Sequence, residues 1–115
     1  MSGFSFALQR TKEFGRWYSE QDGRDRLRLD ARIQAMILGE FVDSKSLSDG
    51  LFELRWRSGM RVYFSRKRVA NIDIFVLWGG FKGTQNTDIA KARVLKMRSE
   101  YEAEIEAGEK NEDAS

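Results

Sequence analysis

The chain contains neither cysteine nor histidine, and these two absences narrow the chemistry that it can perform. Without cysteine it can form no disulfide bond, thiolate metal site or cysteine nucleophile. Without histidine it lacks the side chain best suited to proton transfer near neutral pH, and zinc sites with histidine or cysteine ligands are excluded. An enzyme with this sequence must work with arginine, lysine, tyrosine, aspartate or glutamate. We expect no metal ion and no cofactor.

Long apolar segments are also missing. The longest apolar run, around residues 74–78, is far too short to span a bilayer. The N-terminus lacks the charged and then apolar segments that make up a secretion signal. We therefore expect a cytoplasmic protein that does not bind membranes.

A chain of 115 residues, 41% of them hydrophobic, suits one domain with a modest core. Its net charge of +2 conceals an uneven distribution. The charged residues in 54–72 are all basic, whereas those in 100–115 are all acidic apart from one lysine. This asymmetry favours a surface that binds polyanions, and a solvated charged surface is the alternative. The basic residues of the central stretch are Arg55, Arg57, Arg61, Arg66, Lys67 and Arg68.

Hydrophobic periodicity predicts an α+β fold with the element order β-α-α-β-β-β-α. A short strand is expected at residues 4–8, followed by helices at 11–20 and 24–38. Asp22-Gly23 supplies a turn between the two helices, which should therefore form an antiparallel hairpin. Residues 40–50 are rich in serine and aspartate and are predicted to form a loop.

Three strands are predicted after this loop, at residues 51–57, 61–66 and 72–78. Their short connections favour consecutive antiparallel pairing. The third strand is the most apolar of the three and is predicted to be the central one.

The last helix is predicted to begin at residues 84–87 and to end at Gly108. The domain then covers residues 1–108, and residues 109–115 form a disordered acidic tail. Folding of this tail over the basic residues is an alternative, but a flexible, solvated tail is favoured. The apolar stripe of the helix comprises Ala90, Val94, Met97, Tyr101 and Ile105.

The hairpin between the first two of the three strands decides where the basic side chains point. A two-residue loop at Ser58-Gly59 would place Arg61 among apolar side chains, and burying an unpaired arginine costs several kcal/mol. A three-residue loop that also includes Met60 keeps the apolar residues on one face and the arginines on the other, so this register is favoured. The favoured register pairs Arg57 with Arg61 and Arg55 with Tyr63, and it displays Arg55, Arg57, Arg61 and Tyr63 on one face.

Like charges on one sheet face repel each other unless an anion lies among them or a carboxylate such as Glu53 compensates them. The arginine face therefore predicts phosphate binding, with a compensated surface as the alternative. Lys82 follows the third strand in the glycine-rich segment 79–85, just before a helix N-terminus that also favours an anion. The segment is not a Walker loop, because the required spacing of glycines and lysine is absent.

Three short blocks, taken in their order and spacing, resemble the RelE/ParE superfamily of toxins and most closely its HigB-like addiction-module killer proteins. The resemblance covers about residues 4–100. It implies the small RelE-like fold, in which a helical hairpin packs on a mostly antiparallel sheet with a C-terminal helix. The blocks are Gly50–Arg55, Gly59–Phe64 and Leu77–Gln85, with Asp88-Ile89 and Ala92 after them and Phe14–Trp17 in the first helix.

The resemblance implies the toxin of a type II toxin–antitoxin system, an mRNA endoribonuclease that inhibits translation and in many relatives acts only inside the ribosome. The ribose 2′-hydroxyl would attack its adjacent phosphorus without a metal ion, leaving a 2′,3′-cyclic phosphate and a 5′-hydroxyl. In relatives that cleave RNA, basic residues surround the scissile phosphate, and the matching positions are Arg55, Arg61 and Lys82, which we expect to be catalytic. The expected RNA-binding residues are Arg57, Tyr63, Arg66, Lys67 and Gln85.

The chain departs from its relatives on the last helix, where some of them have a tyrosine that stacks on a base or assists proton transfer. The nearest position here is Asp88, and Tyr63 is a candidate substitute. Arginine remains protonated near neutral pH and is a poor general base. The sequence therefore leaves the identity of the general base open.

The implied partners are mRNA, the ribosome and a cognate antitoxin of the helix-turn-helix type that is encoded adjacently. The antitoxin would form a hetero-oligomer with the toxin and cover the basic face or block ribosome entry. Trp17 and Tyr18 are expected in the core or in the antitoxin contact. A gyrase-binding inhibitor of the ParE type and a non-catalytic nucleic-acid-binding module remain alternatives on the same fold. The basic triad favours the nuclease, because a gyrase binder does not need clustered phosphate ligands.

Overall fold

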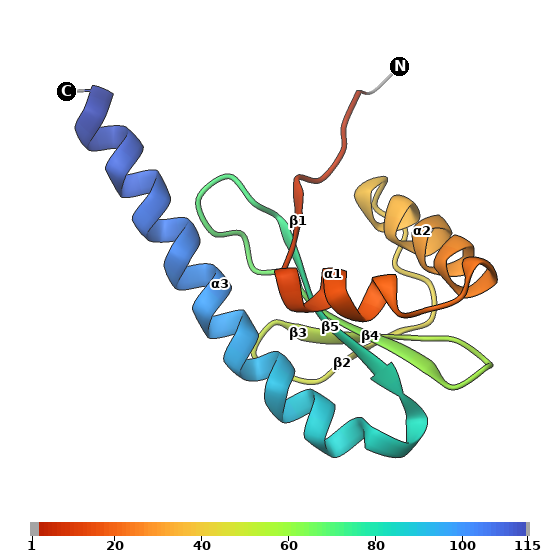
Figure 1. Cartoon of the computed structure of the whole chain (residues 1–115). Helices are drawn as coiled ribbons and strands as arrows, with labels where there is room; N and C mark the ends of the chain where they lie inside the picture. The colour runs from red at the N-terminus through yellow and green to blue at the C-terminus, as the bar shows by residue number, and fades with distance from the viewer. Residues whose placement is uncertain (1–2, 115) are drawn as a thin grey trace.

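The computed structural model describes residues 3–114 and is built around a five-stranded sheet with the strand order β1-β5-β4-β3-β2 (Figure 1). β1 pairs with β5 in parallel, and the other pairings are antiparallel. The predicted α+β class, the mostly antiparallel sheet and the C-terminal helix are thus confirmed. The strands are β1 (Leu8–Arg10), β2 (Ser44–Ser46), β3 (Leu51–Arg55), β4 (Met60–Ser65) and β5 (Ile74–Phe81). The helices are α1 (Lys12–Ser19), α2 (Gly23–Ile37), the 3-10 turn η1 (Lys82–Thr84) and α3 (Gln85–Ala114).

The strand predicted at 72–78 is shifted, because β5 begins at Ile74 and continues through Gly79 and Gly80 to Phe81, where it pairs with Met60. The strands differ from the prediction in three further respects. β1 begins at Leu8, where the predicted strand ended, because its pairing with β5 starts at Ile74, the first residue of β5. β2 forms inside the predicted loop and pairs with the outer edge of β3, and its Ser-Lys-Ser sequence carries no apolar alternation that would reveal it. With β1 and β2 on the two edges, β4 rather than β5 is the central strand. The prediction about the central strand was wrong.

The β3–β4 hairpin has a three-residue loop, as predicted, but the loop consists of Arg57, Ser58 and Gly59. The Trp56 amide donates to the Met60 carbonyl at 3.0 Å, and Gly59 adopts a left-handed φ of 99°. The predicted register was therefore wrong by two residues, and the structure pairs Arg55 with Arg61 and Glu53 with Tyr63. Because side chains alternate with a period of two, this shift leaves each side chain on its predicted face.

The sheet has helices on both faces (Figure 1). α1 and α2 pack on one face, where Phe14 and Ile33 meet the apolar side chains of β3, β4 and β5. α3 packs on the other face, which is the face that carries Glu53, Arg61 and Tyr63. The predicted basic face is therefore not an open sheet surface, because α3 covers most of it and leaves only one end exposed.

The apolar stripe predicted for α3 points away from the sheet. Val94 is 65% exposed, Met97 71% and Tyr101 64%. The side of α3 that meets the sheet presents Leu95 and three small residues, namely Ala92, Ser99 and Ala103. The helix continues past its predicted end at Gly108 to Ala114, and Ser115 lies outside the described residues. The division into a domain of 1–108 and a tail of 109–115 stays a prediction. Within the described residues, no helix has the length and apolar character needed to cross a membrane.

Two consecutive glycines follow a bulge in β5 and, as neighbours in a strand, face opposite sides of the sheet. Phe64 pairs with Val76 but Tyr63 pairs with Trp78, so Leu77 is an extra residue. Gly79 then lies against Trp17 of α1, where a Cβ atom would come within 2.2 Å of the indole ring. The absence of a side chain at this position is what allows α1 to sit this close to the sheet.

Replacing Gly79 by alanine should therefore destabilise the protein. We expect Gly79→Ala to lower the free energy of unfolding by about 1–3 kcal/mol, because Trp17 and α1 must shift to admit the methyl group. Gly15→Ala is the control, since Gly15 lies within α1 with open space around it, and it should raise stability by about 0.5–1 kcal/mol. Urea unfolding of both variants measures the difference, and a Gly79→Ala protein as stable as the wild type would contradict this packing.

Candidate anion-binding site

A cavity of about 530 Å³ opens at the end of the sheet that α3 leaves uncovered. Its walls come from the start of β2, the β3–β4 hairpin and η1, which the antiparallel pairing brings to one end of the sheet. Five of its lining residues are basic and one is acidic. The lining comprises Asp43, Ser44, Lys45, Arg55, Trp56, Arg57, Gly59, Arg61 and Lys82.

Arg61 is the most deeply placed of the basic residues, with 9% of its surface exposed. Its Nη1 atom donates to the carbonyls of Trp56 at 3.1 Å and Met60 at 3.0 Å. Its Nε atom is buried and has no hydrogen-bond partner in the described part of the chain. Glu53 Oε1 lies 4.0 Å from this Nε, beyond hydrogen-bond distance, so the charge of Arg61 is only partly compensated and the guanidinium is suited to an anion in the cavity.

Glu53 lies beneath the cavity and is 1% exposed. Its carboxylate accepts hydrogen bonds from Arg55 Nε at 2.8 Å and Gln85 Nε2 at 3.0 Å, and Oε1 lies 4.0 Å from Arg61 Nε. Burial favours the neutral acid, but the hydrogen bonds from Arg55 and Gln85 outweigh it and lower the pKa of Glu53. The buried carboxylate thus compensates part of the positive charge and holds the side chains of Arg55 and Gln85.

Tyr63 is completely buried under α3, so the prediction that it lies on an exposed face was wrong. The antiparallel pairing sets it opposite Glu53, and the residues of α3 close over both. Burial raises the pKa of the Tyr63 hydroxyl, and the negative charge of Glu53 raises it further. Tyr63 can neither stack on a base nor act as an acid–base group at the surface in this arrangement.

Lys82 reaches the cavity because η1 is tied to the hairpin loop. Its backbone N–H donates to the Gly59 carbonyl at 2.8 Å. Asp88 does not line the cavity, and instead accepts hydrogen bonds from Trp78 Nε1 at 2.9 Å and Thr84 Oγ1 at 2.5 Å. It lies over Gly80, where a Cβ atom would come within 2.0 Å of its carboxylate. Asp88 therefore fastens the start of α3 to β5 and so positions η1.

Three charged residues at the site were missed by the sequence reasoning, namely Arg32, Asp43 and Lys45. Arg32 of α2 donates to the carbonyls of Arg55 and Val42, and its guanidinium lies 4.3 Å above the Trp56 ring. Asp43, the acidic residue of the lining, has a left-handed φ of 57°, and its carbonyl accepts the Arg55 N–H at 3.1 Å. The only signal for Arg32 is its place at a four-residue spacing after Arg24 and Arg28 in the second helix, and Asp43 and Lys45 had none because β2 was not predicted.

The structure brings together Arg55, Arg57, Arg61 and Lys82 in one cavity, and places Gln85 behind it on Glu53. It does not bring Arg66 and Lys67 there, because both follow the opposite end of β4. The Arg66 guanidinium stacks 3.7 Å from the centre of the Phe41 ring, and Lys67 Nζ lies 3.9 Å from Glu100. The described residues contain no group of three or more acidic side chains arranged to hold a metal ion.

Comparison with known proteins identifies one family relationship. The chain is 36% identical over 91 residues to an uncharacterized protein of Haemophilus influenzae, and the match covers 76% of this chain and 90% of that protein. The chain therefore belongs to the same family as that protein. No protein-family model matches the chain, and no solved structure matches it.

Removing the charge of Glu53 should destabilise the protein in a pH-dependent way. Glu53→Gln leaves the buried Arg61 without its counter-charge, and we expect the free energy of unfolding to fall by about 2 kcal/mol at neutral pH. Because folding lowers the pKa of Glu53, the wild-type advantage is present above the pKa of the unfolded chain and is lost as the pH falls through the folded-state pKa. Urea unfolding of both proteins at a series of pH values measures this convergence.

The control for this measurement is Glu104→Gln on the exposed surface of α3, which should leave the stability unchanged at every pH. A stability difference between wild type and Glu53→Gln that stays constant from neutral to acid pH would contradict the role assigned to the Glu53 carboxylate.

Proposed function

We propose that this protein is the toxin of a type II toxin–antitoxin system, has the RelE-like fold, and cleaves messenger RNA. The observation that carries the proposal is the buried Arg61 guanidinium with an unpartnered Nε at the wall of a cavity with five basic lining residues and one acidic one. A phosphodiester group in the cavity would supply the negative charge that its excess of basic residues favours, next to a guanidinium whose charge Glu53 only partly compensates. The antiparallel sheet, the helices on both of its faces and the resemblance of the sequence blocks support the finer fold assignment.

In the proposed reaction the ribose 2′-oxygen forms a bond to phosphorus, and the bond from phosphorus to the 5′-oxygen of the next nucleotide breaks. Negative charge increases on the phosphate oxygens in the transition state. Arg55 and Arg61 hold those oxygens through charge-assisted hydrogen bonds, and Glu53 keeps Arg55 in place. Lys82, which also lines the cavity, donates a proton from its ammonium group to the leaving 5′-oxygen, which departs as a hydroxyl. Removing one such donor costs about 2.7–4 kcal/mol in the transition state.

The 2′-hydroxyl must lose its proton, and the structure offers a carboxylate for this step. Asp43 is the acidic residue among those that line the cavity, whereas Glu53 is sealed beneath it by Arg55 and Gln85. The Asp43 carbonyl is held by the N–H of Arg55, so its side chain is attached to the same strand end as the phosphate ligands. We assign Asp43 as the general base, a role that neither the buried Tyr63 nor the arginines can fill.

The remaining features of the proposal follow from the same cavity. The ribosome would present the RNA to this cavity, and such orientation of the nucleophile would lower the barrier for a catalyst without histidine. Its excess of basic residues also suits the acidic side chains of an antitoxin, which would inhibit the enzyme by covering it. These partners and the cytoplasmic location belong to the proposal.

The first test is the appearance of new RNA ends in cells. Brief induction of the wild-type protein should produce 5′-hydroxyl ends within coding regions, and Arg61→Ala should reduce their yield about 100- to 1000-fold. Lys82→Ala should reduce the yield of new ends only partly, and it should not destabilise the fold because Lys82 is exposed. Arg24→Ala on the surface of α2 removes the same charge outside the cavity and should cleave normally. Growth arrest without new RNA ends would contradict the proposal and point to a protein target such as gyrase.

The assignment of the general base has its own test. Asp43→Asn should slow single-turnover cleavage of RNA about 100-fold or more without weakening RNA binding, because it removes the proton acceptor and keeps the shape. Asp49→Asn is a matched control, since Asp49 also has a left-handed φ and is exposed but does not line the cavity. Equal cleavage rates for Asp43→Asn and the wild type would remove Asp43 from the mechanism.

A further inference from the structure

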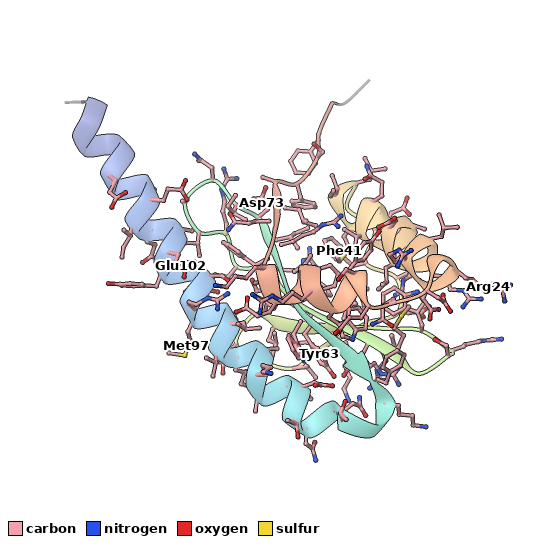
Figure 2. The ribbon with its side chains drawn as sticks, in the orientation of Figure 1. Arg24, Phe41, Tyr63, Asp73, Met97 and Glu102 are labelled. Carbon is pink, nitrogen blue, oxygen red and sulfur yellow. The ribbon has the colours of Figure 1, made fainter. Side chains whose placement is uncertain are left out.

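α3 has two apolar stripes on opposite sides, and the sheet covers only one of them. The inner stripe consists of Ala92, Leu95 and Ala103 together with a buried serine. The outer stripe consists of larger side chains, and Figure 2 shows its member Met97 projecting from the helix on the side away from the sheet. Large exposed apolar side chains aligned on one helix face mark an interaction surface. The outer stripe comprises Val94, Met97, Tyr101 and Ile105, which are 65%, 71%, 64% and 42% exposed.

The spacing of the outer stripe fits a helical partner. Its members follow one another at intervals of three or four residues, so they stay on one side of the helix over more than two turns. Such a narrow seam is the pattern that one helix presents to another in a coiled coil. The outer stripe is therefore suited to pairing with a second helix rather than to a flat surface.

The charges along α3 indicate which helix that is. Every charged residue from 90 to 99 is basic, and every charged residue from 100 to 109 is acidic. A second α3 in antiparallel orientation would therefore set the basic half of each helix beside the acidic half of the other. A parallel pair would place like charges side by side and be disfavoured. The charge pattern of α3 is therefore complementary to that of a second α3 in antiparallel orientation.

We propose that two copies of this chain associate through the outer stripes of their α3 helices, which cross in antiparallel orientation at the level of Ser99. In this register Val94 of one copy packs on Ile105 of the other, and Met97 packs on Tyr101. Arg98 of one copy lies beside Glu102 of the other, in addition to the contacts that it makes within its own chain with Glu13 and Glu102. None of the four residues of the outer stripe lines the cavity. The inference does not depend on the proposed ribonuclease activity.

Sedimentation equilibrium of the purified full-length protein tests the association. The wild type should have twice the single-chain mass of 13.3 kDa, and Met97→Glu should return it to the single-chain mass by placing a charge in the centre of the seam. Leu27→Glu is the matched control, because Leu27 is equally exposed, at 71%, but lies on α2, and this variant should remain a dimer. Circular dichroism of both variants confirms that each has folded.

Cysteine cross-linking tests the orientation, because the native chain has no cysteine of its own. Under mild oxidation a mixture of Val94→Cys and Ile105→Cys should form the mixed disulfide dimer, whereas each variant alone should not. Cross-linking of Val94→Cys with itself would indicate a parallel pair and overturn the antiparallel arrangement. A monomeric wild type, a dimer that Met97→Glu leaves intact, or a monomer that binds a different protein through the outer stripe would each overturn the proposal.

Discussion

The buried carboxylate of Glu53 is the interaction on which the candidate site depends. It lies in the central part of the sheet, accepts hydrogen bonds from Arg55 and Gln85, and faces the buried guanidinium of Arg61. Without it, two arginines that pair across adjacent strands would have no opposite charge between them. One acidic side chain thus makes a concentrated positive charge compatible with a folded core. Because it neutralises only part of that charge, the cavity above it remains basic.

The position of α3 is the second constraint, and it connects the site to the rest of the fold. Two glycines after the β5 bulge allow Trp17 to approach from one side and Asp88 from the other. Asp88 then fixes the first turn of α3, and the Lys82 backbone is bonded to the hairpin loop that carries Arg57. Because α3 begins beside the cavity, it covers Tyr63 and Glu53 but not Arg61. The boundary between core and cavity is therefore set by where this helix begins.

Much of the fold could be predicted from the sequence because its signals are local. The order of the elements other than β2, the two N-terminal helices, the three-residue hairpin loop and the shared face of Arg55, Arg57 and Arg61 follow from periodicity, turn residues and alternation along strands. The grouping of Lys82 with Arg55 and Arg61 was implied by the family resemblance. Short-range patterns do not show that a short polar segment pairs with the edge of β3. β2 was therefore not predicted, and neither was the place of Asp43 beside it. Such patterns also do not show that a face rich in arginine lies under a helix, and Tyr63 was misplaced for that reason.

The error about α3 has a different origin. The outer stripe is more apolar than the inner one, so hydrophobicity alone selects the wrong side of the helix. The inner side uses alanine and serine because α3 lies close to the sheet, and small residues permit that approach. The mismatch between apolar character and burial is itself informative, since a helix that serves two interfaces must be apolar on both sides.

The central claim is that Arg61 and Arg55 bind the phosphodiester of an RNA substrate, and nuclear magnetic resonance of the arginine Nε–H groups tests it most directly. A short RNA with 2′-O-methyl riboses cannot be cleaved by 2′-oxygen attack and can be added to the folded protein. The account predicts that the Nε–H resonances of Arg61 and Arg55 shift on addition of this RNA, while that of Arg66, which stacks on Phe41 at the other end of β4, does not. Unchanged resonances for Arg61 and Arg55, with shifts confined to Arg66 and its neighbours, would contradict it.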